Sequence, residues 1–181
     1  MPDLVTFAEL RDWGQQEKAK KALAEASSFS RTGKTTFLAH SSRDDDLVAG
    51  VILILENHGA TVYADHKDPS ITTEGLLQIA DHLRTVVGEC RKFVMLATPR
   101  SKDSKWIPWE LGLGDGLRKS ENIVIFPSAE YAHETTWSKQ EYLGLYNRIV
   151  WGELKGQEKP LWFVWDHHRN TGTQLQQWLA R

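Results

Sequence analysis

The chain has 181 residues, of which 40% are hydrophobic and 25% are charged, as in an ordinary soluble globular domain with an accessory segment. The formal net charge is −2 and no long basic run is present, which argues against a nucleic-acid partner. The single cysteine, Cys90, excludes an internal disulfide framework and any metal site built from several cysteines. The first residues lack the pattern of a secretory signal, and the longest apolar stretch, residues 47–55, is too short to span a membrane. We therefore expect a cytoplasmic protein with no membrane partner.

Residues 1–33 are expected to form an N-terminal helix and a linker, and residues 34–181 the main domain. Residues 6–27 are rich in Ala, Lys, Glu and Gln, which favours a helix with a mostly solvated face. Thr6 and Glu9 have the spacing of a capping box at its start. The polar residues that follow the helix would form the linker.

From residue 34 onward, short apolar runs alternate with helical patterns. The apolar runs predict strands over residues 35–40, 60–65, 92–98 and 122–127. The segments between them predict helices over residues 41–59, 75–90 and 108–120. The first of these helices is apolar almost all round and should be buried on more than one side. This alternation implies right-handed βαβ crossovers and a central parallel sheet.

The last part of the chain has a different pattern. Residues 148–152 and 161–165 are β-prone and are separated by a polar turn, so they predict a hairpin or one further strand. Residues 128–140 are loop-like, and residues 173–181 predict a short closing helix.

Residues 31–36, RTGKTT, resemble the end of a nucleotide phosphate loop. That motif requires G-x-x-x-x-G-K-[ST] between a strand and a helix. The position of the first glycine is taken by Ser28, and the residues after Lys34 are β-prone. We therefore interpret Gly33 and Lys34 as leading into the first strand, which disfavours a phosphate-loop nucleotidase.

Residues 101–116, SKDSKWIPWELGLGDG, carry the densest chemical signal. They follow the third predicted strand, and ligands bind at the carboxyl ends of parallel strands. Pro108 suits the first turn of a helix, which would place Glu110 in that turn and on the same face as Trp106. A carboxylate beside indole rings at this edge could stabilise the cation that forms when an N-glycosidic bond is cleaved.

The sequence leaves open both the pKa of Glu110 and its role. Contact with tryptophan would raise the pKa of Glu110, whereas the N-terminus of a helix would lower it, and the sequence does not decide between them. Alternatively, Glu110 is an ordinary first-turn acid with Trp106 and Trp109 in the core.

The order of these motifs resembles a bacterial stand-alone TIR (Toll/interleukin-1 receptor) domain protein. Residues 35–127 carry FLAHSSRDDDL, an apolar helix, VYAD, a proline-containing loop, a strand ending in LATPRSKDSKW, and WIPWELG. The W-x-x-x-E pair of Trp106 and Glu110 is the most specific element. Residues 141–151, EYLGLYNRIVW, extend the similarity to the TIR proteins of Thoeris-type antiphage defence. The resemblance implies an α/β, flavodoxin-like TIR fold, with a central parallel sheet flanked by helices and an extra N-terminal helix.

The resemblance also implies a function. A protein of this kind is expected to cleave NAD⁺ as an NAD⁺ glycohydrolase or ADP-ribosyl cyclase, releasing nicotinamide and an ADP-ribose-derived product that signals in antiphage immunity. It would need no cofactor beyond NAD⁺ as substrate. Its partners would be NAD⁺, further copies of itself through TIR–TIR contacts, and a downstream effector that senses the product. The alternative is a non-catalytic TIR–TIR signalling or assembly module.

Site residues follow from the match with the family motifs. Glu110 matches the catalytic glutamate. The expected substrate-binding residues are His40, Ser41, Ser42, Arg43, Asp65 and Trp106. The first four match the turn that lines the nicotinamide pocket, and Asp65 ends the second strand. The loop over residues 66–75 lacks the Pro-Gly pair common in receptor TIR loops.

Several of these residues also have plainer interpretations. His40 could simply form the turn at a strand end, and Arg43 could be a solvated charge beside the acids that follow it. The residues 44–46 are explained better as helix-start acids than as metal ligands. His167 and His168 lack a third ligand nearby. No metal site is therefore expected.

Overall fold

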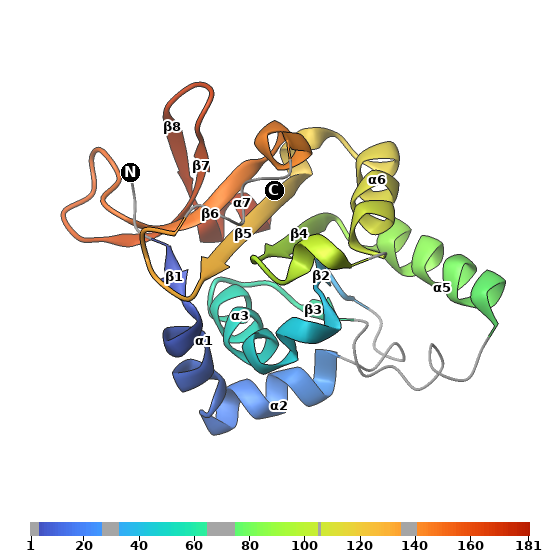
Figure 1. The fold of residues 1–181 in the computed structure, drawn as a ribbon. Helices are drawn as coiled ribbons and strands as arrows, with labels where there is room; N and C mark the ends of the chain where they lie inside the picture. The colour runs from blue at the N-terminus through green and yellow to red at the C-terminus, as the bar shows by residue number, and fades with distance from the viewer. Residues whose placement is uncertain (1–3, 27–32, 65–74, 105, 135–140) are drawn as a thin grey trace.

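The computed structural model describes residues 4–26, 33–64, 75–104, 106–134 and 141–181 (Figure 1). The strands are β1 (Val5–Thr6), β2 (Thr36–Ala39), β3 (Val62–Ala64), β4 (Lys92–Ala97), β5 (Ile123–Ala129), β6 (Asn147–Gly152), β7 (Leu161–Asp166) and β8 (Thr171–Gln174). The helices are α1 (Phe7–Gly14), α2 (Glu17–Ala26), α3 (Asp45–Asn57), α5 (Leu76–Glu89), α6 (Ile107–Leu117) and α7 (Leu175–Ala180), with 3₁₀ turns η1 (Ser42–Asp44), η3 (Ser101–Asp103), η4 (Ser120–Asn122) and η6 (Glu141–Leu145). Within these ranges, no helix combines the length and the apolar composition that crossing a membrane requires.

The strands form a mostly parallel sheet in the order β3-β2-β4-β5-β6-β7-β8, which confirms the expected α/β class. The pairs from β3 to β6 are parallel, and β7 and β8 are antiparallel to their neighbours. The five parallel strands from β2 to β6, numbered along the chain, lie in the order 2-1-3-4-5, which is that of flavodoxin-like folds. The strand order reverses between β2 and β4, and ligands of such folds bind outside the carboxyl ends of the strands at this point.

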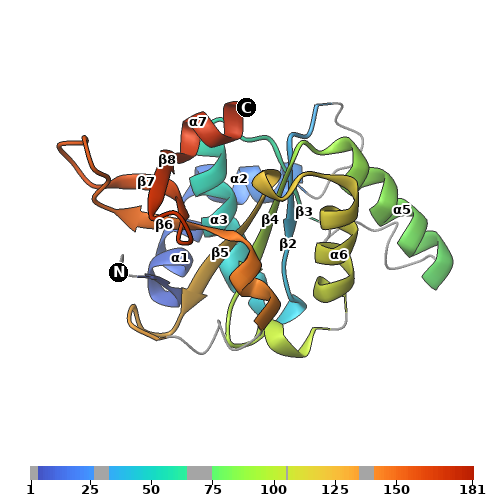
Figure 2. The same cartoon turned by 90° about the horizontal axis from the view of Figure 1, so that it is seen from above.

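Each face of the sheet is covered by its own helices (Figure 2). Along β4, the side chains of Phe93, Met95 and Ala97 pack with α5 and α6, whereas Val94 and Leu96 pack on the opposite side with α3. Both sets are fully buried, because a sheet covered on both faces has no solvated side. This explains why the strands show continuous apolar runs in the sequence.

The N-terminal region differs from the single helix that was predicted. It forms two helices, α1 and α2, separated at residues 15–16, and both pack against α3. The side of each helix that faces α3 is buried, with Leu10, Ala19 and Ala26 fully buried. The other side of α2 is largely exposed, as expected. The apolar surface of α3 extends round the helix, so the chain bends to lay both helices along it. The predicted burial of α3 on more than one side is confirmed.

Two further strands were missed by the sequence. The two-residue strand β1 pairs in parallel with β5, and the Ser128 hydroxyl donates a hydrogen bond to the Val5 carbonyl oxygen at 2.8 Å. β8 extends the predicted β6–β7 hairpin by pairing with β7. The capping box at the start of α1 is confirmed, since the Thr6 and Glu9 backbone N–H groups each donate to the other residue's side chain. The domain boundary at residue 33 stays a prediction. β1 pairs with β5 of the main sheet, and α1 packs against α3.

Lys34 does not have the surroundings of a phosphate-binding lysine. Its ammonium group donates to the carbonyl oxygens of Glu25 at 2.8 Å and Val62 at 2.7 Å. Gly33, at φ 101°, makes the turn that leads into β2. Lys34 thus ties the end of α2 to β3.

This role predicts the effect of Lys34→Met. We expect the free energy of unfolding to fall by about 1–2 kcal/mol, because two partly buried carbonyl groups lose their donor. Urea denaturation would measure the change, with the exposed Lys159 replaced in the same way as a control. Equal stability of the two variants would contradict this role.

Candidate active site

Glu110 lies on the side of α6 that faces the sheet. The buried positions of this helix are Ile107, Glu110, Leu111 and Gly114, which form one helical face at i, i+3, i+4 and i+7. The helix approaches the sheet closely, since a Cβ atom on Gly114 would lie 2.9 Å from the Phe93 ring. Only 1% of Glu110 is exposed. Glu110 is therefore an acid of the first turn of α6, as predicted, and its side chain is buried rather than solvated.

The two tryptophans at the start of α6 are only partly covered. Trp106 is 38% exposed, and its ring meets the Trp109 ring edge to face with centroids 5.6 Å apart. The Trp106 carbonyl oxygen accepts a hydrogen bond from the Glu110 N–H at 2.8 Å, so Trp106 begins the turn that carries Glu110. The plainer interpretation, with both rings in the core, is therefore wrong for Trp106.

The turn after β2 contains the four residues that were predicted to line the pocket. His40 is buried, and its Nε2 atom lies 3.7 Å from Asp45 Oδ1. Ser41 is also buried, and its hydroxyl oxygen accepts a hydrogen bond from the Arg43 N–H at 3.3 Å. Ser42 and Arg43 are exposed. The turn thus directs two polar side chains inward and two outward.

Three contacts join this turn to the loop after β4. Arg43 Nη1 lies 2.9 Å from Asp103 Oδ2, and Arg100 Nη1 donates to the Arg43 carbonyl oxygen at 3.1 Å. The Thr98 hydroxyl donates to Asp44 Oδ2 at 2.8 Å. Because the loop after β4 leads directly into α6, these contacts connect the His40–Arg43 turn to the start of the helix that carries Glu110. The predicted site residues on these two segments are therefore held at the same edge of the sheet, at the β2/β4 switch point.

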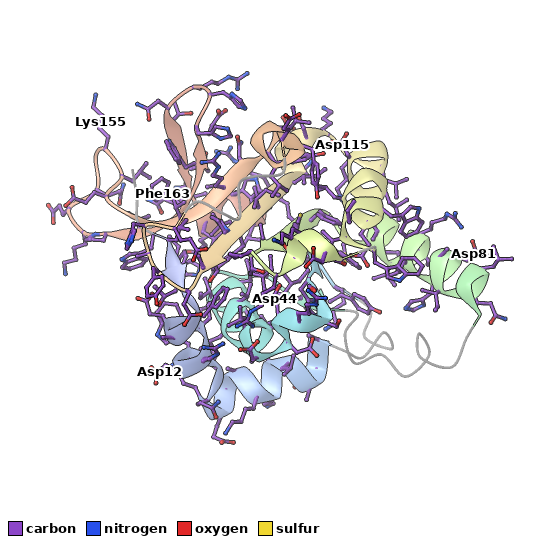
Figure 3. All side chains as sticks on the ribbon, viewed as in Figure 1. Asp12, Asp44, Asp81, Asp115, Lys155 and Phe163 are labelled. Carbon is purple, nitrogen blue, oxygen red and sulfur yellow. The ribbon has the colours of Figure 1, made fainter. Side chains whose placement is uncertain are left out.

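Asp44 also lies at this edge of the sheet, and the sequence did not identify it as a site residue. It directly precedes the first residue of α3 (Figure 3) and is completely buried. Burial raises its pKa to about 6, against the opposing effects of the Thr98 hydrogen bond and the positive charge of Arg100. The spacing to the apolar residues of α3 could not single it out, because Asp45 and Asp46 also precede buried residues by four and seven positions.

Of the remaining candidate residues, the two histidines and the cysteine have other surroundings. Asp65 lies outside the described residues. His167 and His168 both direct Nε2 at the Gly144 carbonyl oxygen, at 3.1 and 2.9 Å. Burial raises the pKa of the Cys90 thiol to about 11, so this cysteine is not an activated nucleophile at neutral pH. Within the described ranges, no group of three or more His, Cys, Asp or Glu side chains could hold a metal ion.

Comparison with curated proteins finds a relative of this chain. The probable 3′ cyclic ADP-D-ribose synthase ThsB′ of Bacillus cereus (strain MSX-D12) is 29% identical over 129 residues, covering 70% of this chain and 66% of the synthase. The chain is a distant homologue of a Thoeris TIR-domain protein. The expected resemblance is therefore confirmed, and the observed α/β fold is consistent with a TIR domain. No family model matches the chain. The match spans slightly less than two thirds of the relative's length.

Proposed function

We propose that this TIR-domain protein cleaves NAD⁺ at the bond between nicotinamide and ribose. The observation that carries the proposal is the burial of Glu110, which lies on the sheet-facing side of α6 beside the β2/β4 switch point. Burying a carboxylate costs free energy, and a carboxylate buried at a ligand-binding edge is a candidate for a functional group. The similarity to a cyclic ADP-ribose synthase supports the same chemistry.

The carboxylate would act on the charge that develops in the transition state. As the glycosidic bond breaks, its electron pair passes to the nicotinamide nitrogen and neutralises the pyridinium ring. The ribose carbon is left as an oxocarbenium ion, which the Glu110 carboxylate would stabilise electrostatically. We place the nicotinamide end of NAD⁺ near His40, Ser41, Ser42 and Arg43, with Asp65 and the Trp106 ring as further substrate contacts.

The product depends on which oxygen attacks the ribose carbon. Attack by water yields ADP-ribose, whereas attack by a hydroxyl of the same ADP-ribosyl group yields a cyclic product that is lighter by one water. In both cases the attacking oxygen releases a proton. The name of the relative favours the cyclic product. We propose that the product signals to a downstream effector in antiphage immunity and that activity depends on self-association through TIR–TIR contacts.

The experiment is to incubate the purified protein with NAD⁺ over a range of protein concentrations. Nicotinamide release is followed by chromatography, and the mass of the second product distinguishes ADP-ribose from a cyclic isomer. We expect the specific activity to rise with protein concentration, because the active form is assembled. Absence of nicotinamide at every concentration would instead favour a non-catalytic TIR–TIR module.

A further inference from the structure

Asp44 is an unusual group in the core of this protein. Its Oδ2 atom accepts the Thr98 hydrogen bond, but its Oδ1 atom is buried, and the described residues place no hydrogen-bond donor within reach of it. The positively charged Arg100 Nη1 lies 4.0 Å from Oδ1. A buried carboxylate with one oxygen unsatisfied is expensive, and so it calls for a functional explanation.

The Thr98 hydroxyl group connects Asp44 to the loop after β4. While it donates its proton to Asp44, its oxygen accepts hydrogen bonds from the backbone N–H groups of Arg100 at 3.0 Å and Ser101 at 3.1 Å. The Ser101 hydroxyl in turn donates to the Thr98 carbonyl oxygen at 2.9 Å. The Thr98 hydroxyl group is therefore one of the groups that hold the loop, and the acceptor on Asp44 sets its orientation.

Helix α1 also contacts the loop after β4. The Arg100 guanidinium lies 4.5 Å from the centre of the Phe7 ring, and its Nη1 lies 3.1 Å from Asp46 Oδ1. Arg11, on α1, pairs with the same Asp46 at 2.7 Å. These contacts join α1, the first turn of α3 and the loop after β4 around a single arginine.

We propose that Asp44 is a positioning residue of the NAD⁺-cleaving site, whose ionised carboxylate holds the loop after β4 in the geometry that places Glu110. The inference rests on the proposed function and deepens it. The loop passes through η3 and enters α6 only a few residues before Glu110, and the Ile107 N–H at the start of the helix donates to the Ser104 hydroxyl at 3.3 Å. A displacement of the loop would therefore move the first turn of α6.

Charged groups from three elements face Asp44. Arg100 from the loop and His40 from the end of β2 favour its ionised form, whereas Asp46 in α3 opposes it. Because burial raises the pKa above its ordinary value of 3.8, the folded protein holds the proton more tightly than the unfolded chain. Ionisation of Asp44 therefore lowers the stability of the folded state. This loss is absent below about pH 4, where the carboxyl group is protonated in both states, and is fully present above about pH 6.

The first test is Asp44→Asn, which replaces the charged acceptor of the Thr98 hydrogen bond with a weaker neutral one and removes the charge that attracts Arg100. We expect kcat for nicotinamide release to fall at least tenfold with little change in KM, while the melting temperature at pH 8 rises above that of the wild type. The difference in melting temperature between Asp44→Asn and the wild type should disappear near pH 4. In the wild type, kcat should fall as the pH drops and Asp44 becomes protonated, and this fall should be absent in Asp44→Asn. Asp12→Asn, on the exposed side of α1 (Figure 3), should change none of these quantities.

The second test changes the donor. Thr98→Ser keeps the hydroxyl group and should retain most of the activity, whereas Thr98→Val removes it and should lower kcat at least tenfold. Hydrogen exchange at the Arg100 and Ser101 amides should be faster in Thr98→Val than in Thr98→Ser, with or without NAD⁺. An active protein in which kcat and amide exchange are the same in all these variants would overturn the inference. A wild-type protein that releases no nicotinamide would overturn the proposed function instead, and amide exchange would still decide whether the Asp44–Thr98 pair holds the loop.

Discussion

Replacement of Glu110 with glutamine is expected to lower the rate of nicotinamide release by at least about 10²-fold, through loss of electrostatic stabilisation of the transition state. Glutamine has nearly the same shape as glutamate, so it can occupy the buried position between Ile107 and Leu111 without a cavity. The change removes the negative charge beside the developing oxocarbenium ion, and so kcat should fall far more than KM rises.

Three measurements on Glu110→Gln make this result specific. Nicotinamide release gives the rate, a thermal melt shows that the fold is intact, and the concentration dependence of the residual activity shows that assembly is unchanged. Glu158→Gln is the matched control, because Glu158 is exposed on the turn between β6 and β7. If Glu110→Gln released nicotinamide at the wild-type rate, the carboxylate would not be the catalytic group.

The second large effect is expected from Gly50→Ala, which should lower the free energy of unfolding by about 2 kcal/mol, since overpacking outweighs the gain in helix propensity. A Cβ atom on Gly50 would overlap the carbonyl oxygen of Leu10, so α1 must move away from α3. For a chain of this length, the melting temperature should fall by about 4–8 °C.

Gly88→Ala provides a matched comparison in α5. A Cβ atom at this position meets no atom within 4 Å, and so only the helix propensity changes. We expect this variant to be more stable than the wild type by about 0.5 kcal/mol. If Gly50→Ala were as stable as Gly88→Ala, α1 would not lie against α3 as described.

Most of the central sheet could be predicted from the sequence. The strands β2 to β5 are continuous apolar runs bounded by turns and helical patterns, and such runs are the local signature of a sheet covered on both faces. β1 could not be predicted in this way, because two residues carry no periodicity. It forms because β5 offers partners at Ser128 and Ala129, more than a hundred residues away. The break between α1 and α2 likewise depends on the shape of α3.

Part of the candidate site could likewise be predicted from the sequence, and part could not. The sequence by itself determined that a tryptophan and a glutamate, Trp106 and Glu110, stand at the start of a helix after a buried strand, because spacing and capping are local properties. It could not distinguish Asp44 from the two acids that follow it, since all three suit the start of a helix equally well. Only the tertiary structure separates them. It turns Asp44 inward to the Thr98 hydroxyl, 54 residues along the chain, and leaves the exposed Asp46 to pair with Arg11 and Arg100. Burial and charge pairing decide the role of a carboxylate, and both depend on which distant segments the fold brings together.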